Sequence, residues 1–486
     1  MFTIASMLRT NINKATPAQP WVSQLAGVLP LSALIDFINV PRVLHVYQLT
    51  GRMPLWCWTV TPSGSRLLFA GRNDREVCCL DRVKNGQGSI CLDGRYGDMY
   101  ILTSSTTMEM CLGGTQCKAV ANTHPNVEAE AYKRPQSLEI VAVKRRTMEA
   151  PLLPSHRRTK AEQIAIHGDT RSPMSDHVRR LKRIAAKAPI FSKLPHSPHS
   201  RKHLVATVFG CLIWSLLTAL TIILGCWIST AFLLVVLLTG CAVFSIFGRK
   251  PRTFGERGVS TYNRLVLTAP HLNDTRWRVF FGESTVLNSM LNWPLLPRRP
   301  CQPHWTLTLA LRLLILGHCP LGIGSAAEQG LDAYLITFWI VFCILMQNLV
   351  FSSNSCVRDW LETSAEVNLE RSGITVSSRR ALINTIMALN PDTLSEHTQL
   401  DHYGVEKFDE TGMLWLDAIL KRNPERARWQ EASRQAMSGI RLGQATLASL
   451  AASYEREWWW KFVVEGIEVA ERVRSNTRLS SRFVSH

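Results

Sequence analysis

The longest apolar segment of the chain runs from Leu204 to Phe247, and its 44 residues include no charged residue, histidine, asparagine, glutamine or proline. A bilayer core is about 30 Å thick and a helix rises about 1.5 Å per residue, so the segment is roughly twice as long as one span. It predicts a transmembrane hairpin with spans near 204–224 and 230–247 and a turn at Gly225. A buried hairpin in a soluble core is the alternative, but such helices seldom stay apolar on every face.

Two further apolar stretches lie in the second half of the chain. Residues 331–351 carry a single charge, Asp332, at one end and are long enough to span. Residues 305–324 are a weaker candidate, because they contain Arg312 and His318 and their second half is interrupted by Pro320, Gly322 and Gly324. We predict a third span here, with a re-entrant or interfacial helix as the alternative.

Lysines and arginines flank the outer ends of both pairs of spans, whereas the short turns at 225–230 and 325–333 contain none. Loops rich in these cations stay in the cytoplasm. We therefore predict four spans, with both termini and the loop 248–304 in the cytoplasm. Without the third span, the C-terminal third would cross to the other side and break this pattern. The flanking cations are Lys187, Lys193, Arg201, Lys202, Arg249, Lys250, Arg252, Arg257, Arg298, Arg299, Arg358 and Arg371.

The tripeptide Asn273-Asp274-Thr275 is the only Asn-x-Ser/Thr glycan acceptor in the sequence, and it allows the topology to be tested. Because the predicted orientation puts it in the cytoplasm, we expect Asn273 to carry no glycan. Treatment of the membrane-expressed protein with an N-glycosidase should leave its electrophoretic mobility unchanged. A gain in mobility would invert the predicted orientation.

Residues 1–132 have the composition of a soluble region that contains β-structure. Short β-favouring runs alternate with turn dipeptides, which predicts a small antiparallel sheet. The runs cover 55–60, 66–70, 76–80 and 99–103. Six of the 13 cysteines lie here, and in a cytoplasmic region we expect reduced, mostly buried thiols. The two Cys-x-x-Cys pairs of a zinc site are absent. The six are Cys57, Cys78, Cys79, Cys91, Cys111 and Cys117.

The formal net charge is +18, and it is concentrated before the first span. Residues 133–202 hold 17 lysines and arginines against five acids, and their proline, serine and histidine content favours a basic flexible linker over 133–203. The lipid bilayer, and anionic lipid headgroups in particular, are the expected partners, at about 1 kcal/mol per close cation. No nucleic acid is expected, because the chain is fixed in a membrane. The densest cluster is Arg179, Arg180, Lys182 and Arg183.

The loop 248–304 carries the most distinctive residues of the chain. They are Tyr262-Asn263-Arg264-Leu265, His271-Leu272-Asn273, Trp277, Phe280-Phe281-Gly282-Glu283 and Leu291-Asn292-Trp293-Pro294-Leu295, with Met413-Leu414-Trp415-Leu416-Asp417 to Leu420 farther on. This pattern resembles an uncharacterised family of fungal integral membrane proteins over about 200–430. The resemblance implies a membrane location and a fungal source, and it transfers no catalytic residue.

The same loop offers the only candidates for an active site. His271, Glu283 and Ser284, with Asp274 nearby, are titratable or nucleophilic, but the Gly-x-Ser-x-Gly pattern fails at Val286. No P-loop, Gly-x-Gly-x-x-Gly or His-Glu-x-x-His motif occurs, so the sequence predicts neither a cofactor nor a metal. A folded loop whose aromatic residues pack beneath the membrane is the preferred interpretation.

Four polar residues occur inside the predicted spans, and polar residues in a membrane are functional candidates by default. They are Arg312, His318, Gln347 and Asn348. Snorkelling to the interface or hydrogen bonding between helices is the preferred interpretation. A transport pathway is the alternative, although spans this apolar offer little to line a polar channel.

The C-terminal region, 352–486, is predicted to be soluble and helical. Apolar residues at 413, 416, 419 and 420 form one helical face that stops near Asn423-Pro424, and a longer helix is predicted from about Ile440 to Arg474. Trp458, Trp459 and Trp460 would fan over roughly 200° of that helix, at about 100° per residue, so one stripe cannot bury all three. These helices pack on one another, or bind a protein partner or the membrane interface.

The sequence thus predicts an α-helical membrane protein with about four transmembrane helices, a small β-containing N-terminal region and a helical cytoplasmic C-terminal region. Its leading functional class is a membrane-anchored interaction or scaffold protein, because most of the chain is cytoplasmic and lacks catalytic motifs. A membrane enzyme that uses the loop 262–295 is the alternative, and a transporter ranks third.

Overall fold

The structure is a computed structural model of the 486-residue chain. It describes residues 40–51, 53–58, 81, 88–125, 135–145, 198–247, 251–254, 262–293, 295, 305–328, 330–394, 399–400, 406–407, 411–443 and, between 446 and 476, all but 448, 450–453 and 455.

Four of the described helices are long and apolar enough to cross a membrane, as the sequence predicted. They are α10 (Pro198–Leu224), α11 (Trp227–Phe247), α13 (Trp305–Glu328) and α14 (Leu331–Leu349). The turn between the first two lies at Gly225, whose φ of +68° favours glycine. Helix α13 continues through Pro320, so the predicted interruption does not end it.

The outer faces of these helices are apolar as well as exposed. The leucines at 212, 216 and 313 are 64%, 72% and 61% exposed. A water-soluble protein rarely leaves so much contiguous apolar surface uncovered, whereas lipid is a good solvent for it. The exposure therefore supports a membrane hairpin over the alternative of a soluble core.

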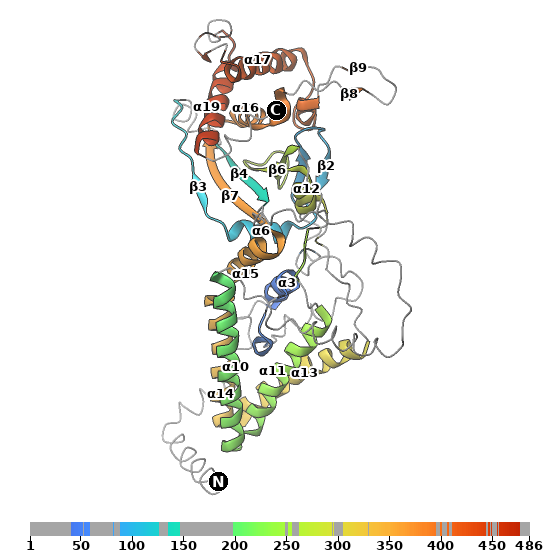
Figure 1. The fold of residues 1–486 in the computed structure, drawn as a ribbon, viewed down its shortest axis with the longest axis vertical. Coiled ribbons are helices and arrows are strands. Elements are labelled where there is room, and N and C mark those ends of the chain that lie inside the picture. Colours follow the sequence, from blue (N-terminus) through green and yellow to red (C-terminus); the bar gives the residue numbers. More distant parts are fainter. Residues whose placement is uncertain are drawn as a thin grey trace, which may run out of the picture.

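An N-terminal segment is inserted into the helical bundle. It comprises α3 (Val40–Thr50) and η2 (Leu55–Cys57), and Figure 1 shows α3 between the bundle and the sheet. The Trp56 indole is buried, lies 5.8 Å and 5.5 Å from the Trp339 and Phe342 rings, and donates to the Thr207 carbonyl at 3.2 Å. The predicted strand at 55–60 was therefore wrong, because packing of Trp56 in the bundle outweighs the β propensity of this run.

A seven-stranded mixed sheet lies at the end of the helical bundle, beyond α3 (Figure 1). Its order is β2-β1-β5-β6-β4-β7-β3; the pairs β6–β4 and β7–β3 are parallel and the others are antiparallel. The strands are β1 (Ile90–Asp93), β2 (Met99–Ile101), β3 (Cys117–Ala119), β4 (Gln136–Arg145), β5 (Asn263–Ala269), β6 (Arg276–Glu283) and β7 (Val367–Val376). The strand predicted at 99–103 is β2, while 66–70 and 76–80 lie outside the described residues.

Side chains alternate between the two faces of the sheet, as the pleat requires. Val141 and Phe280 face the bundle and share one buried core with Trp339 of α14. Ile140 and Phe281, one position away, belong to a second core with the C-terminal helices. The first face is covered by α6 (Ser105–Gly113), α12 (Ser284–Leu287), η3 (Asn288–Asn292), α15 (Ser353–Trp360) and η4 (Leu361–Ala365). A continuous core therefore joins the sheet to the long apolar helices.

The second face is covered by η6 (Thr411–Ala418), α16 (Arg379–Leu389), α17 (Pro424–Arg441) and α19 (Trp460–Asn476). Asn423 caps α17 by accepting from the Arg426 N–H at 2.7 Å, which explains the boundary predicted there. Trp459 and Trp460 are 9% and 6% exposed, whereas Trp458 is 53% exposed, so one tryptophan stays outside as expected.

Three sequence boundaries require correction. The sheet is not confined to residues 1–132, because β5 and β6 come from the predicted loop and β7 from the predicted helical region. Residues 136–145 form a central strand instead of the start of a flexible linker, since the apolar run 140–143 is buried on both faces. Residues 440–474 are not one helix, because α17 ends at Arg441 and Gly443 has a φ of +66°.

The buried cysteines of the sheet region are expected to be poorly reactive thiols. Cys91 and Cys111 are free thiols with 0% and 3% exposure. Burial disfavours the thiolate; it raises the pKa of Cys91 to about 12 and also raises the pKa of Cys111. Cys57 is also a buried free thiol, Cys117 is an exposed one, and Cys78 and Cys79 lie outside the described residues.

Candidate functional site at the edge of the sheet

The catalytic candidates of the loop do not form one site. His271 lies in the turn before β6, where its imidazole is exposed and 3.8 Å from the Asp274 carboxylate. Glu283 is the last residue of β6, pairs with Arg145 at 3.5 Å and accepts from Thr285. Ser284 follows it. Because an eight-residue strand is about 26 Å long, the imidazole and these two side chains are at opposite ends of β6.

Two residues of the family-like motif have structural roles. Arg264 donates to the buried Asp93 carboxylate at 2.9 Å and to the Asn288 side chain at 3.0 Å, which ties β5 to β1 and η3. Tyr262 donates to the Asp392 carboxylate at 2.9 Å. Burial, and next the Asp392 charge, raise the pKa of the Tyr262 phenol, so it remains a donor.

The polar residues of the predicted spans make separate contacts. Gln347 is buried and donates to the Cys57 carbonyl at 3.1 Å, so it fixes the inserted N-terminal segment. His318 on α13 is buried, its Nδ1 lies 2.9 Å from the Leu314 carbonyl, and its ring meets the edge of Phe232. Asn348 is exposed and Arg312 is half-buried. The basic cluster at 179–183 lies outside the described residues.

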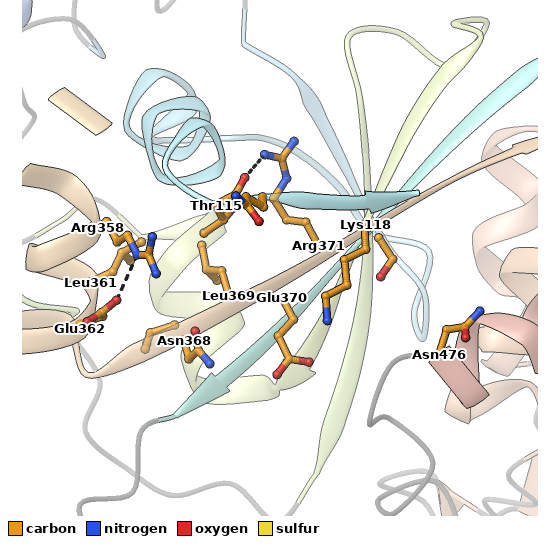
Figure 2. Close-up of a pocket in the computed structure, with 13 residues that line it drawn as sticks. Thr115, Lys118, Arg358, Leu361, Glu362, Asn368, Leu369, Glu370, Arg371 and Asn476 are labelled. Atoms are coloured by element: carbon orange, nitrogen blue, oxygen red, sulfur yellow. Dashed lines mark hydrogen bonds and ion pairs between the residues drawn. The ribbon is translucent and has the colours of Figure 1, made fainter. Parts of the chain in front are cut away.

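The structure shows a different candidate, a polar cavity of about 610 Å³ beside β7 (Figure 2). Its walls come from β7, β3 and the turn before it, the segment α15–η4 and the last residue of α19, Asn476. Asn476 lies at one end of the cavity and Glu362 at the other. Glu366, with a φ of +56°, ends η4 and turns the chain into β7 along the cavity.

The edge of β7 is open along this cavity. On one side the whole strand pairs with β4, but on the other side β3 pairs only with residues 371–373. Gly373 accepts the Val120 N–H at 2.8 Å, so its peptide groups point toward β3. Leu369, four residues earlier, directs its N–H and carbonyl to the same side. Among the described residues no strand pairs with 367–370 on that side.

Charges of both signs surround the open edge. Lys118 is exposed, and Glu370 pairs with Lys144 at 2.9 Å while 35% of its side chain stays exposed. Arg358 and Glu362 pair at 3.2 Å on the opposite wall. Partly exposed pairs of this kind contribute little to stability.

Arg371, which also lines the cavity, fixes the geometry of this edge. Its guanidinium donates to the Glu139 carboxylate at 2.6 Å, to the Thr115 carbonyl at 2.8 Å and to the Leu112 carbonyl. Glu139 also accepts from Arg278 of β6 at 2.9 Å. This network joins three strands to the end of α6, so the floor of the cavity is rigid.

The residues that line the cavity offer polar groups for binding. None of the described residues that line it is a histidine or a cysteine. Across the described part of the chain, no group of three or more His, Cys, Asp or Glu is placed to hold a metal ion. What the cavity does offer is backbone donors and acceptors beside half-exposed charges, which suits an extended polypeptide.

Sequence reasoning missed this site because its walls come from residues near 115, 360, 370 and 476, which only the fold brings together. The ten-residue strand β7 was the available signal, since Val367, Leu369 and Ile374 alternate partly with polar residues.

Comparison with known proteins gives no match to a family model, a curated protein or a solved structure. The resemblance to fungal membrane proteins therefore stays a prediction.

Proposed function

We propose that this chain is a multi-pass membrane protein that binds an extended segment of a partner protein along the open edge of β7. It belongs in this view to the predicted class of membrane-anchored interaction or scaffold proteins, and its relationship to the fungal membrane family is part of the same proposal. The single observation that carries the binding role is a length of β7, residues 367–370, that pairs with no described strand on the side of the polar cavity.

The parts of the chain that supply the strands of the sheet support the proposed topology. Its strands come from before α10, from between α11 and α13, and from after α14, so a pair of candidate spans separates each segment from the next. Strands of one sheet lie on the same side of a membrane, which is what an even number of crossings gives. Arg201 and Lys202 at the start of α10 favour the cytoplasmic side.

The open edge supports binding by strand addition. An extended peptide that joins a sheet gains main-chain hydrogen bonds from the edge strand and specificity from side-chain pockets. Because the bundle, the sheet and η4 share one core, the edge is held in a fixed place near the membrane. Pre-organisation of this kind lowers the entropic cost of binding.

A substitution that removes the backbone N–H of Leu369 tests whether a partner strand pairs with this edge. We would place a photo-crosslinking amino acid at Asn368, which is exposed and lines the cavity, and irradiate native membranes. A partner adduct should form in the parent protein and with Leu369→Ala, but not with Leu369→Pro. The two variants lose the same leucine, and proline also removes the N–H that a bound strand needs.

The same photo-crosslinking residue at Ala427, exposed on α17, which contributes no residue to the cavity, is the position control. An adduct that persists with Leu369→Pro, or that forms equally from Ala427, would contradict strand addition at β7.

A further inference from the structure

Strand β2 is the edge strand of the sheet at the end opposite β3 (Figure 1). It pairs with β1 on one side, and among the described residues no strand pairs with its other side. Met99 and Ile101 are 56% and 63% exposed. Edge strands are commonly protected by lysine or proline, and residues 99–101 contain neither. We call this open side of residues 99–101 the β2 edge.

The backbone groups of Met99 and Ile101 point to the β2 edge. The Asp98 carbonyl and the Leu102 N–H bond to the β1 segment, each at 2.9 Å, so the even-numbered residues face β1. Because the direction alternates along an antiparallel strand, the N–H and carbonyl groups of Met99 and Ile101 face away from β1.

The β2 edge is short and closed at both ends. Beyond Ile101, the Thr103 N–H donates to the Leu291 carbonyl of η3 at 3.2 Å. Before Met99, the chain turns back into β1 through Gly97, whose φ is +76°. A long extended peptide would therefore meet η3, whereas a three-residue strand that turns away at its own end would fit.

We propose that the β2 edge pairs with the β2 edge of a second copy of this chain, antiparallel and centred on Tyr100. In this register Met99 of each copy lies opposite Ile101 of the other, and their outward backbone groups form about four hydrogen bonds between the chains. The Gly97 turn of one copy faces Thr103 of the other, at the end that η3 closes. A shift by one residue would oppose outward groups to inward ones, so this edge is complementary to itself.

Pairing also covers the exposed apolar side chains. Met99 and Ile101 lie on the same face of the sheet, because they are two residues apart. Each would contact the other residue type on the second copy, and apolar cross-strand pairs of this kind stabilise a sheet.

The symmetry of the pairing suits a membrane protein. A two-fold axis perpendicular to a sheet relates antiparallel strands and keeps each face of the sheet on its own side. One face of this sheet packs on the long apolar helices and the other on the C-terminal helices. The apolar helices of both copies therefore lie on one side of the joined sheet, where a single bilayer can hold them. Confinement in that bilayer raises the effective concentration of the second copy and compensates for the short strand.

Cysteine cross-linking of the full chain in native membranes tests the register. One tagged copy carries Met99→Cys, a second copy with a different tag carries Ile101→Cys, and the membranes are treated with a mild oxidant. Residues opposite each other in a hydrogen-bonded pair have Cα atoms about 5.5 Å apart, which is within disulfide range. We expect at least about fivefold more disulfide between the tags from this mixed pair than from Met99→Cys in both copies, since diagonal neighbours are farther apart.

Asp98→Cys in both copies, which is farther out of register, is the position control, and the parent chain gives the background from native cysteines. Equal yields from the three combinations, or no yield above the parent, would overturn the proposal. A disulfide that joins Met99→Cys to a different protein would overturn it as well.

Ile101→Pro and Ile101→Ala separate strand pairing from apolar contact. Both remove the isoleucine, but only proline also removes the outward N–H, which β1 does not use. Energy transfer between donor-labelled and acceptor-labelled copies in reconstituted vesicles should be lost with Ile101→Pro and remain measurable with Ile101→Ala. Loss with both variants alike, or with neither, would overturn the pairing. The β7 edge lies at the other end of the sheet, so photo-crosslinking from Asn368 still tests the proposed function independently.

Discussion

Gly240→Ala should destabilise the protein by about 3–5 kcal/mol, because it forces the inserted N-terminal segment out of the bundle. A Cβ on Gly240 of α11 would overlap the carbonyl oxygen of Leu55, which is backbone and cannot rotate away. If η2 moves, Trp56 leaves its aromatic pocket and Gln347 loses its bond to the Cys57 carbonyl. The measurement is the thermal midpoint of the purified protein in detergent, followed by tryptophan fluorescence.

Gly210→Ala is the second arm of this test, since a Cβ there would overlap the Trp56 ring from the opposite helix. Gly317→Ala on α13 is the matched control, because a Cβ at that position meets nothing within 4 Å. Replacing a helical glycine by alanine without a clash stabilises a helix by about 0.5–1 kcal/mol. Equal midpoints for Gly240→Ala and Gly317→Ala would show that the inserted segment does not depend on these glycines.

The four long apolar helices were predictable because lipid imposes one simple requirement on a membrane span. A span needs about 20 apolar residues with all peptide groups bonded internally, and this leaves a direct trace in the sequence. The turn at Gly225 could be placed for the same reason. The inserted segment left no such trace. Residues 55–57 are apolar like a strand, and only Gly210 and Gly240 on other elements make room for them.

The sheet was harder to predict because its pairing is non-local. The partner of β4 on one side is β6 and on the other β7, and both lie more than a hundred residues farther along the chain. Alternation of polar and apolar residues reveals a strand but not its neighbours. The apolar run of β4 was hidden in a basic segment, so charge was given more weight than burial. The open edge, which depends on where β3 stops pairing, could not be predicted at all.

Arg264 shows that a residue in a distinctive sequence motif can stabilise the fold instead of taking part in a functional site. Tyr262-Asn263-Arg264-Leu265 suggested a functional loop, yet Arg264 donates to Asp93, which is 0% exposed and also accepts from the N–H groups of Arg95 and Tyr96. Asp93 lies 171 residues before Arg264 and ends a short strand, so no local pattern pairs them. A buried charge needs a partner, and this need accounts for an arginine at that position.

Asp93→Ala alone should cost about 3–5 kcal/mol, because it leaves the Arg264 guanidinium largely buried without its anion. The double variant Asp93→Ala, Arg264→Leu should recover part of that loss, since replacing both charges removes the desolvation penalty together with the attraction. The observable is again the thermal midpoint, and the expected order is parent highest, double variant intermediate and Asp93→Ala lowest. Asp98→Ala, on the same hairpin and exposed, should stay within about 0.5 kcal/mol of the parent. If the double variant is no more stable than Asp93→Ala, Asp93 and Arg264 do not form a coupled pair, and the β1–β5 junction is stabilised by its backbone ladder instead.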